Sequence, residues 1–180
     1  MANLAVIPAR GGSKRIPGKR LAASTELAGE FAAGSVSSTI LRTNFVGRSL
    51  REGRSSLTDW LNGALRGTAL VNVFDDVMFS PLAIYTLCHY IERSIVERPL
   101  GVFNLGSRDG MSKADFAFAF AAATGLTTTN LVRSNASAVA TMVAPRPTDM
   151  RMQSDRFEGR MGIRLPRLID EIKVLASDYQ

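Results

Sequence analysis

Glycines and cations gather in one short segment directly after the first apolar run of the sequence. Residues 4–8, Leu-Ala-Val-Ile-Pro, precede a loop that contains two adjacent glycines and several basic side chains. Backbone amides of such a loop can converge on a phosphate group while Arg10, Lys14 and Lys19 supply positive charge. This segment predicts a phosphate-binding loop, although it also fits a basic, solvated turn after an edge strand.

Residues 4–20 resemble the first motif of the acylneuraminate cytidylyltransferases, which join CTP to sialic acid and related sugar acids. The resemblance implies that Arg10, Ser13, Lys14 and Lys19 contact the triphosphate of CTP, with Mg²⁺ as the accompanying ion. Arg20 stands where that family usually has asparagine, and the family's later metal-placing Ser-Thr-Asp segment is missing. The motif therefore predicts nucleotide binding, whereas nucleotidyl transfer is not expected without metal-binding acids.

Other residues with reactive side chains are sparse. One cysteine, Cys88, stands beside one histidine, His89, which excludes an internal disulfide and a zinc site of the usual ligand number. Their helical context predicts that Cys88 is a small core residue and that His89 lies at a polar edge. The acid pair Asp75-Asp76 lacks the surroundings of a metal site, so we predict no bound metal.

The positive charge is concentrated at the start of the chain. The formal net charge is +6, but residues 1–20 hold five Lys or Arg and no acid, and the remainder has 17 basic against 16 acidic side chains. A nucleic-acid binder needs cations spread over a surface, so nucleic acid is not an expected partner. A small phosphate ligand is sufficient to explain the basic segment.

Composition predicts one globular domain. Hydrophobic residues make up 46% and charged residues 21% of the 180 residues, and the mean hydropathy is +0.05. The sequence lacks an apolar run of about 18 residues and a signal-peptide pattern, so we expect a cytoplasmic protein without membrane contact.

Apolar periodicity and punctuation predict alternating strands and helices. Two helices begin at capping pairs, Ser56 with Asp59 and Ser112 with Asp115. The order indicates an α/β fold with one largely parallel sheet. The predicted strands are residues 4–8, 38–45, 70–74 and 101–105, and the predicted helices are 25–33, 56–67, 81–99, 112–123 and one led by 165–166.

From about Leu21 onward the sequence resembles the extended short-chain dehydrogenase/reductases that act on nucleotide sugars, most closely the dTDP-4-dehydrorhamnose reductase branch. Several ordered segments carry this resemblance. They are residues 27–30 (Leu-Ala-Gly-Glu) with 40–47, 79–82 (Phe-Ser-Pro-Leu), 101–107 with 112–116, and 144–147 (Ala-Pro-Arg-Pro) with 161–166. The resemblance implies an incomplete Rossmann-like domain over 21–180, with a small carboxy-terminal substrate lobe, folded as one unit with the strand and loop of 1–20.

The resemblance also implies what is missing. An enzyme of this family binds NAD(P) through a Gly-x-Gly-x-x-Gly loop, a spacing that does not occur in this sequence. Its Tyr-x-x-x-Lys pair falls on Ala22 and Glu26, which cannot act as the proton donor and its cation. We therefore expect catalysis to be lost and NAD(P) binding to rest on the resemblance alone.

The substrate side is retained in this interpretation. By resemblance, Thr43, Asn44 and Phe45 lie where a strand end meets nicotinamide and sugar, Phe45 packs on a sugar or base, and Arg48 reaches a phosphate. Core packing for Phe45 and a solvated position for Arg48 are the alternatives. The predicted ligand is a nucleotide sugar, and the incomplete sheet favours a homo-oligomer or association with a complete reductase. CTP binding through the first loop and a non-enzymatic subunit are the alternative functions.

Overall fold

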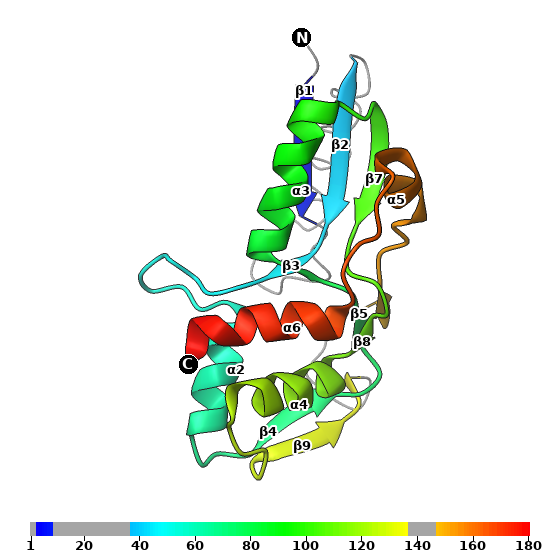
Figure 1. Cartoon of the computed structure of the whole chain (residues 1–180). Coiled ribbons are helices and arrows are strands. Elements are labelled where there is room, and N and C mark those ends of the chain that lie inside the picture. Colours follow the sequence, from blue (N-terminus) through cyan, green and yellow to red (C-terminus); the bar gives the residue numbers. More distant parts are fainter. Residues whose placement is uncertain (1–2, 9–36, 137–146) are drawn as a thin grey trace, which may run out of the picture.

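The computed structural model describes residues 3–8, 37–136 and 147–180. One end of the molecule contains a parallel sheet in the order β1 (Asn3–Pro8), β2 (Ser38–Thr43) and β7 (Gly101–Leu105). Helix α3 (Ile84–Glu97) lies over this sheet, and α5 (Asp155–Met161) packs against β7 (Figure 1). Apolar side chains from these elements and from Leu82 and Leu165 form one cluster, here called the sheet cluster. Its buried members include Leu41, Leu82, Leu87, Phe103, Leu105, Phe157 and Leu165.

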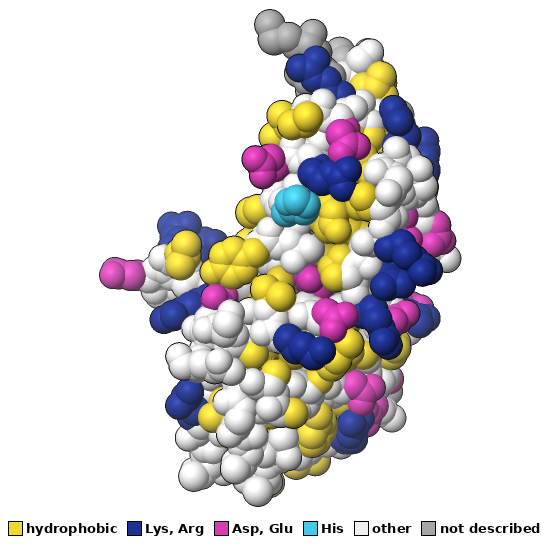
Figure 2. All heavy atoms as spheres, viewed as in Figure 1, with side chains coloured by type: hydrophobic (Ala, Val, Ile, Leu, Met, Phe, Trp, Pro, Cys, Tyr) yellow, Lys and Arg dark blue, Asp and Glu magenta, His cyan; other side chains and the backbone are white. Residues whose placement is uncertain are grey.

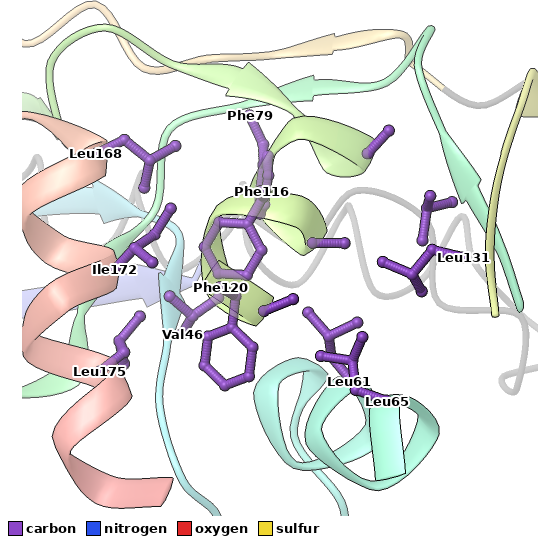
Figure 3. Close-up of a cluster of buried hydrophobic side chains, with 14 of the residues drawn as sticks. Val46, Leu61, Leu65, Phe79, Phe116, Phe120, Leu131, Leu168, Ile172 and Leu175 are labelled. Carbon is purple, nitrogen blue, oxygen red and sulfur yellow. The ribbon is translucent and has the colours of Figure 1, made fainter. Parts of the chain in front are cut away.

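The other end is mainly helical. Helices α2 (Leu57–Arg66), α4 (Lys113–Thr124) and α6 (Leu168–Ala176) pack with the parallel pair β4 (Val71–Phe74) and β9 (Leu131–Ser134). Their apolar side chains form a second cluster, here called the helical cluster (Figure 3). Its buried members include Val46, Leu61, Leu65, Phe79, Phe116, Phe120, Leu131, Leu168, Ile172 and Leu175.

Short strands join the two ends. Strand β3 (Phe45–Val46) pairs with β6 (Leu82–Ala83), and β5 (Met78–Phe79) lies between β10 (Asp149–Met150) and β8 (Met111–Ser112). The short helix η2 (Ser177–Tyr179) follows α6 directly. The chain therefore passes between the two ends through several short segments.

Both predicted capping pairs are confirmed. Ser56 and Asp59 form a complete capping box at the start of α2, and the Ser112 hydroxyl accepts the Asp115 N–H at the start of α4. Gly125 ends α4 with φ +69°, a conformation that favours glycine. Helix α4 also confirms the helical prediction for its alternating phenylalanines and alanines.

Three sequence-based predictions about elements are corrected, and one helix was missed. Residues 71–74 form a strand but pair with β9 and not with β1–β2–β7. The segment 38–45 divides, because Phe45 leaves the first sheet to pair with Leu82. For the same reason α3 begins at Ile84 and not at Pro81. Helix α5 was not predicted.

Cys88 is also corrected, because it is exposed. The buried residues of α3 are Leu87, Tyr90 and Ser94, which leaves Cys88 on a different stripe of the helix. The predicted helix over 25–33 lies outside the described residues. Within the described part of the chain, the helices are too short or too polar to cross a membrane.

Candidate functional site

The parallel strands β1, β2 and β7 end at the same edge of their sheet. Pro8 pairs in register with Thr43, which pairs with Leu105, so the chain continues from all three strands at one level. Ligands of open α/β sheets bind outside the carboxyl ends of the strands. We call the residues that follow here, Asn44, Phe45, Gly106 and Ser107, the carboxyl edge.

Thr43 and Asn44 hold this edge together. Thr43 is fully buried, and its hydroxyl donates to the Asn44 carbonyl oxygen at 3.3 Å. The Asn44 amide Nδ2 donates to the carbonyl of Met150 at 3.1 Å, and its backbone carbonyl accepts the N–H of Leu82 at 3.1 Å. Both residues therefore brace the junction of the two ends.

Buried serines close the other half of the edge. The Gly106 N–H donates to Ser154 Oγ at 3.0 Å, the Met152 N–H donates to Ser80 Oγ at 2.8 Å, and the Ser107 N–H donates to the Ser80 carbonyl at 2.9 Å. A Cβ on Gly106 would lie 2.7 Å from that same carbonyl oxygen, so the backbones approach too closely for any other residue.

Two polar atoms at the carboxyl edge are buried without a hydrogen-bond partner: Asn44 Oδ1 and Ser107 Oγ. Such unpaired buried groups are costly, and they are found preferentially where strain or function requires them. The sequence-based prediction did not include Ser107 among the site residues. The available signal was its position two residues after the end of β7.

Phe45 and Arg48 remain exposed, as a binding role requires. Phe45 is 42% exposed, which excludes the alternative of core packing. Arg48 donates from Nη1 to the Asp178 carbonyl at 3.3 Å, so its guanidinium is directed toward the end of α6. The sequence-predicted site is thus divided into the buried Thr43 and the partly buried Asn44, which brace the junction, and two exposed side chains.

Tyr85 shares this surface near Asp178. Its hydroxyl donates to Asp178 Oδ1 at 3.2 Å, and the negative charge of Asp178 together with this hydrogen bond raises the pKa of Tyr85. Arg48 opposes this shift but is outweighed by Asp178, so the phenol is kept neutral and is not activated as a catalytic tyrosine beside a dominant cation would be.

The adjacent acids Asp75 and Asp76 both form contacts with other parts of the chain. Asp75 and Asp115 both form ion pairs with Arg133, and Asp76 Oδ1 accepts the Ala136 N–H at 2.7 Å. Among the residues the structure describes, groups of three or more acidic, histidine or cysteine side chains suited to a metal ion are not found.

The phosphate-loop residues Arg10, Ser13, Lys14 and Lys19, and the positions Ala22 and Glu26, lie outside the described residues. Their predicted roles stay predictions. The described strand β1 ends at Pro8 beside Thr43, so the chain enters that loop from the carboxyl edge.

Sequence comparison gives no match, either to a protein-family model or to a curated protein. Solved structures do match. The dTDP-4-dehydrorhamnose reductase of Bacillus anthracis, solved with NADP, superposes with a TM-score of 0.79 at 13% identity, over 98% of this chain and 65% of that chain. The Yersinia enterocolitica enzyme of the same name gives 0.77 at 17% identity, over 98% of this chain and 66% of that chain.

A third similar structure is the enzyme WbmG of Bordetella bronchiseptica, solved with NAD and UDP. It gives a TM-score of 0.71 at 17% identity, over 99% of this chain and 59% of that chain. The chain thus spans about two thirds or less of the length of these structures. At these identities the likeness establishes the fold: this is a Rossmann-like α/β chain that shares its architecture with the nucleotide-sugar reductases of the dTDP-4-dehydrorhamnose type, as the sequence predicts.

Proposed function

We propose that the chain binds a nucleotide sugar at its carboxyl edge and does not reduce it unaided. The observation that carries this proposal is the fold, because the similar solved structures are named as dTDP-sugar reductases and as an enzyme that holds NAD and UDP. The chain aligns with them over nearly its whole length.

The exposed side chains suit such a ligand. Phe45 offers an apolar ring at the end of β2, and sugar and base faces pack well on aromatic rings. Arg48 lies three residues further on and keeps guanidinium donors that can bind phosphate oxygens. A uracil or thymine nucleotide with a diphosphate-linked sugar contains both chemical groups.

The residues present do not suit NAD(P). Thr43 is buried and Asn44 spans the junction, while the sequence lacks the glycine spacing that admits a pyrophosphate to a helix start. We therefore expect no measurable NAD(P)H-dependent reduction of a dTDP-4-keto sugar by this chain alone.

Calorimetric titration tests the proposal. We expect heat of binding with a dTDP- or UDP-sugar and none with NADPH. Phe45→Ala should weaken binding about tenfold, because an aromatic contact contributes on the order of 1 kcal/mol beyond its buried area. Trp60→Ala is the matched control, since Trp60 is similarly exposed, at 48%, on α2.

Arg48→Ala should weaken binding of the nucleotide sugar, and Arg51→Ala, an exposed arginine in the same loop, should leave it unchanged. CTP is the second titrant. If CTP binds and the sugar nucleotides do not, the first loop is the functional site and the proposal is wrong. Turnover of NADPH by the unmodified chain would contradict the loss of catalysis.

A further inference from the structure

Arg48, the residue to which the proposed function assigns a phosphate, is held at two points. The backbone N–H of Ser49, the next residue, donates to Asp59 Oδ2 at 2.8 Å. The Arg48 guanidinium donates from Nη1 to the Asp178 carbonyl at 3.3 Å. This carbonyl is uncharged, so the bond orients the guanidinium without neutralising it, and a guanidinium has several further N–H donors for a phosphate. Backbone and side chain of Arg48 are therefore both fixed by segments that lie later in the chain.

Both anchors depend on Tyr179. Its hydroxyl donates at 2.7 Å to Oδ1 of Asp59, the carboxylate whose other oxygen holds the backbone after Arg48. Its ring packs edge-on against Phe120, with ring centroids 5.3 Å apart. Burial raises the pKa of Tyr179 to about 12, so the phenol stays protonated and able to donate. The residue before it, Asp178, supplies the carbonyl that accepts from the guanidinium.

Two further hydrogen bonds hold the short helix η2, to which Tyr179 belongs. The Tyr85 hydroxyl, on α3, donates to Asp178 Oδ1 at 3.2 Å. Arg66, on α2, donates from Nη2 to the Tyr179 carbonyl at 3.4 Å. Helix η2 is therefore tied to both neighbouring helices, and it offers Arg48 an acceptor in a fixed place.

The loop that carries Arg48, residues 47–56, projects from the molecule. In Figure 1 it extends to the left between the start of α3 and the end of α6, and Figure 2 shows basic side chains on it. Arg48, Arg51 and Arg54 are all exposed. Within the part of the chain that the structure describes, Arg48 is the one arginine of this loop whose guanidinium forms a hydrogen bond. An arginine that is already ordered loses less conformational entropy when it binds a phosphate.

We propose that Tyr179 is a positioning residue, which orders Arg48 in advance for the diphosphate of a nucleotide sugar. This inference rests on the proposed function, in which Arg48 binds a phosphate. The Tyr179 hydroxyl is engaged by Asp59 and its ring by Phe120, so it acts on the ligand through Arg48 and not by contact.

A double-mutant cycle tests the proposal, with calorimetric titration of dTDP-glucose as the measurement. In the wild-type background, Tyr179→Phe should raise the dissociation constant about three- to tenfold, as expected when one long side chain must be ordered on binding. In the Arg48→Ala background the same change should alter it less than about twofold, because the residue that Tyr179 positions is gone. An equal loss in both backgrounds, or no loss in either, overturns the proposal.

The control for a general loss of stability is Gly162→Ala. Gly162 ends α5 with φ +60°, so alanine is strained there although the space for a Cβ is open. Helix α5 packs against β7, away from the loop and η2, so this variant should bind dTDP-glucose as the wild type does. Weakening by Gly162→Ala equal to that by Tyr179→Phe would show that stability alone governs the affinity and would contradict the positioning role.

A measurement without ligand separates this inference from the proposed function. Hydrogen exchange of the Ser49 amide, followed by NMR, reports the backbone anchor of Arg48, and it should be faster in Tyr179→Phe than in Gly162→Ala. Equal exchange in the two variants overturns this inference, whatever the ligand does. Absence of dTDP-glucose binding to the wild type overturns the proposed function, and binding that Arg48→Ala leaves unchanged contradicts both.

Discussion

The two oxygens of Asp59 accept hydrogen bonds from three segments of the chain. Oδ2 accepts the N–H groups of Ser49 at 2.8 Å and Ser56 at 3.0 Å, and Oδ1 accepts the Tyr179 hydroxyl at 2.7 Å. Ser49 and Ser56 are the two ends of the exposed loop that precedes α2. One carboxylate therefore closes this loop, caps a helix and anchors η2.

Removing the Tyr179 hydroxyl should destabilise the protein. This hydroxyl also lies 2.8 Å from Thr58 Oγ1, so Tyr179→Phe removes one hydrogen-bond partner from the buried Thr58 and the partner of Asp59 Oδ1. We expect a loss of about 1–3 kcal/mol in the free energy of unfolding. Urea denaturation followed by the fluorescence of Trp60 measures it. Tyr85→Phe is the control: because it removes an exposed hydroxyl, it should lower the free energy of unfolding far less than Tyr179→Phe does.

Asp59 also predicts an acid-sensitive contribution to stability. Burial opposes its ionisation, but hydrogen bonds from Ser56, Tyr179 and Ser49 outweigh this effect and lower its pKa to about 2. Because the folded pKa lies below the unfolded value near 3.8, the contribution is complete above about pH 5 and is lost as the pH falls toward 2. We expect about 1 kcal/mol after allowance for solvent screening. Comparing the acid unfolding of wild type and Asp59→Asn measures it, and identical pH dependence in both would refute the assignment.

At the scale of single elements, replacing two glycines of different backbone conformation by alanine should change the free energy of unfolding in opposite directions. Gly125 has φ +69° at the end of α4, whereas Gly159 lies inside α5 without a positive φ, and both have open space where a Cβ would go. Gly125→Ala should lower the free energy of unfolding by about 1 kcal/mol, and Gly159→Ala should raise it by about 0.5–1 kcal/mol. Thermal unfolding of the two variants measures both. A gain in stability from Gly125→Ala would contradict the left-handed end of α4.

The sequence predicts elements well where the signals are local. The capping pairs at Ser56 and Ser112 identified two helix starts correctly because a cap depends on residues three apart. The partner of a strand is not encoded locally, which is why residues 70–74 were correctly predicted as a strand, observed at 71–74, but assigned to the wrong sheet. Helix α5 was missed because it is short and contains Gly159.

The candidate site was predictable to a similar extent. The strand end at residues 43–45 was located, but the division between the buried Thr43 and the exposed Phe45 depends on the switch of Phe45 to a second sheet. Cys88 was expected in the core because the apolar stripe of α3 is wider than its buried face. Glu171 was not anticipated, since its partners lie more than eighty residues earlier in the chain.

At the scale of the whole molecule, Glu171 joins the two ends. It lies on α6 among the helical cluster and is 2% exposed. Its Oε2 accepts the N–H of Ala83 at 2.5 Å and its Oε1 accepts the Thr86 hydroxyl at 3.0 Å. Ala83 provides no side-chain cap for α3, so this distant carboxylate takes that role, as a negative charge at a helix start should.

Replacing Glu171 should weaken the coupling between the two ends. Glu171→Ala leaves the start of α3 without its cap, and we expect a loss of about 2–3 kcal/mol together with separate transitions by Trp60 fluorescence and by far-ultraviolet circular dichroism. In the wild type the two transitions should coincide. Coincident transitions in the variant would show that other contacts couple the ends.

The pKa of Glu171 supplies a second measurement. Burial raises it above the usual 4.5, although hydrogen bonds from Ala83 and Thr86 oppose the shift. Because the folded pKa exceeds the unfolded one, the free energy of unfolding should fall as the pH rises from 4.5 through the raised value. Glu171→Gln should remove this decline, and an unchanged pH dependence in that variant would contradict it.

The alternation of the chain between its two apolar clusters has a consequence for how such a protein can evolve. Leu82 belongs to the sheet cluster and the adjacent Ala83 to the helical cluster, and Leu165 and Leu168 divide in the same way. A recombination event that exchanged either half of the gene would leave both cores incomplete. These segments are therefore expected to be inherited together as one block, whereas the exposed loop before α2 is free to diverge.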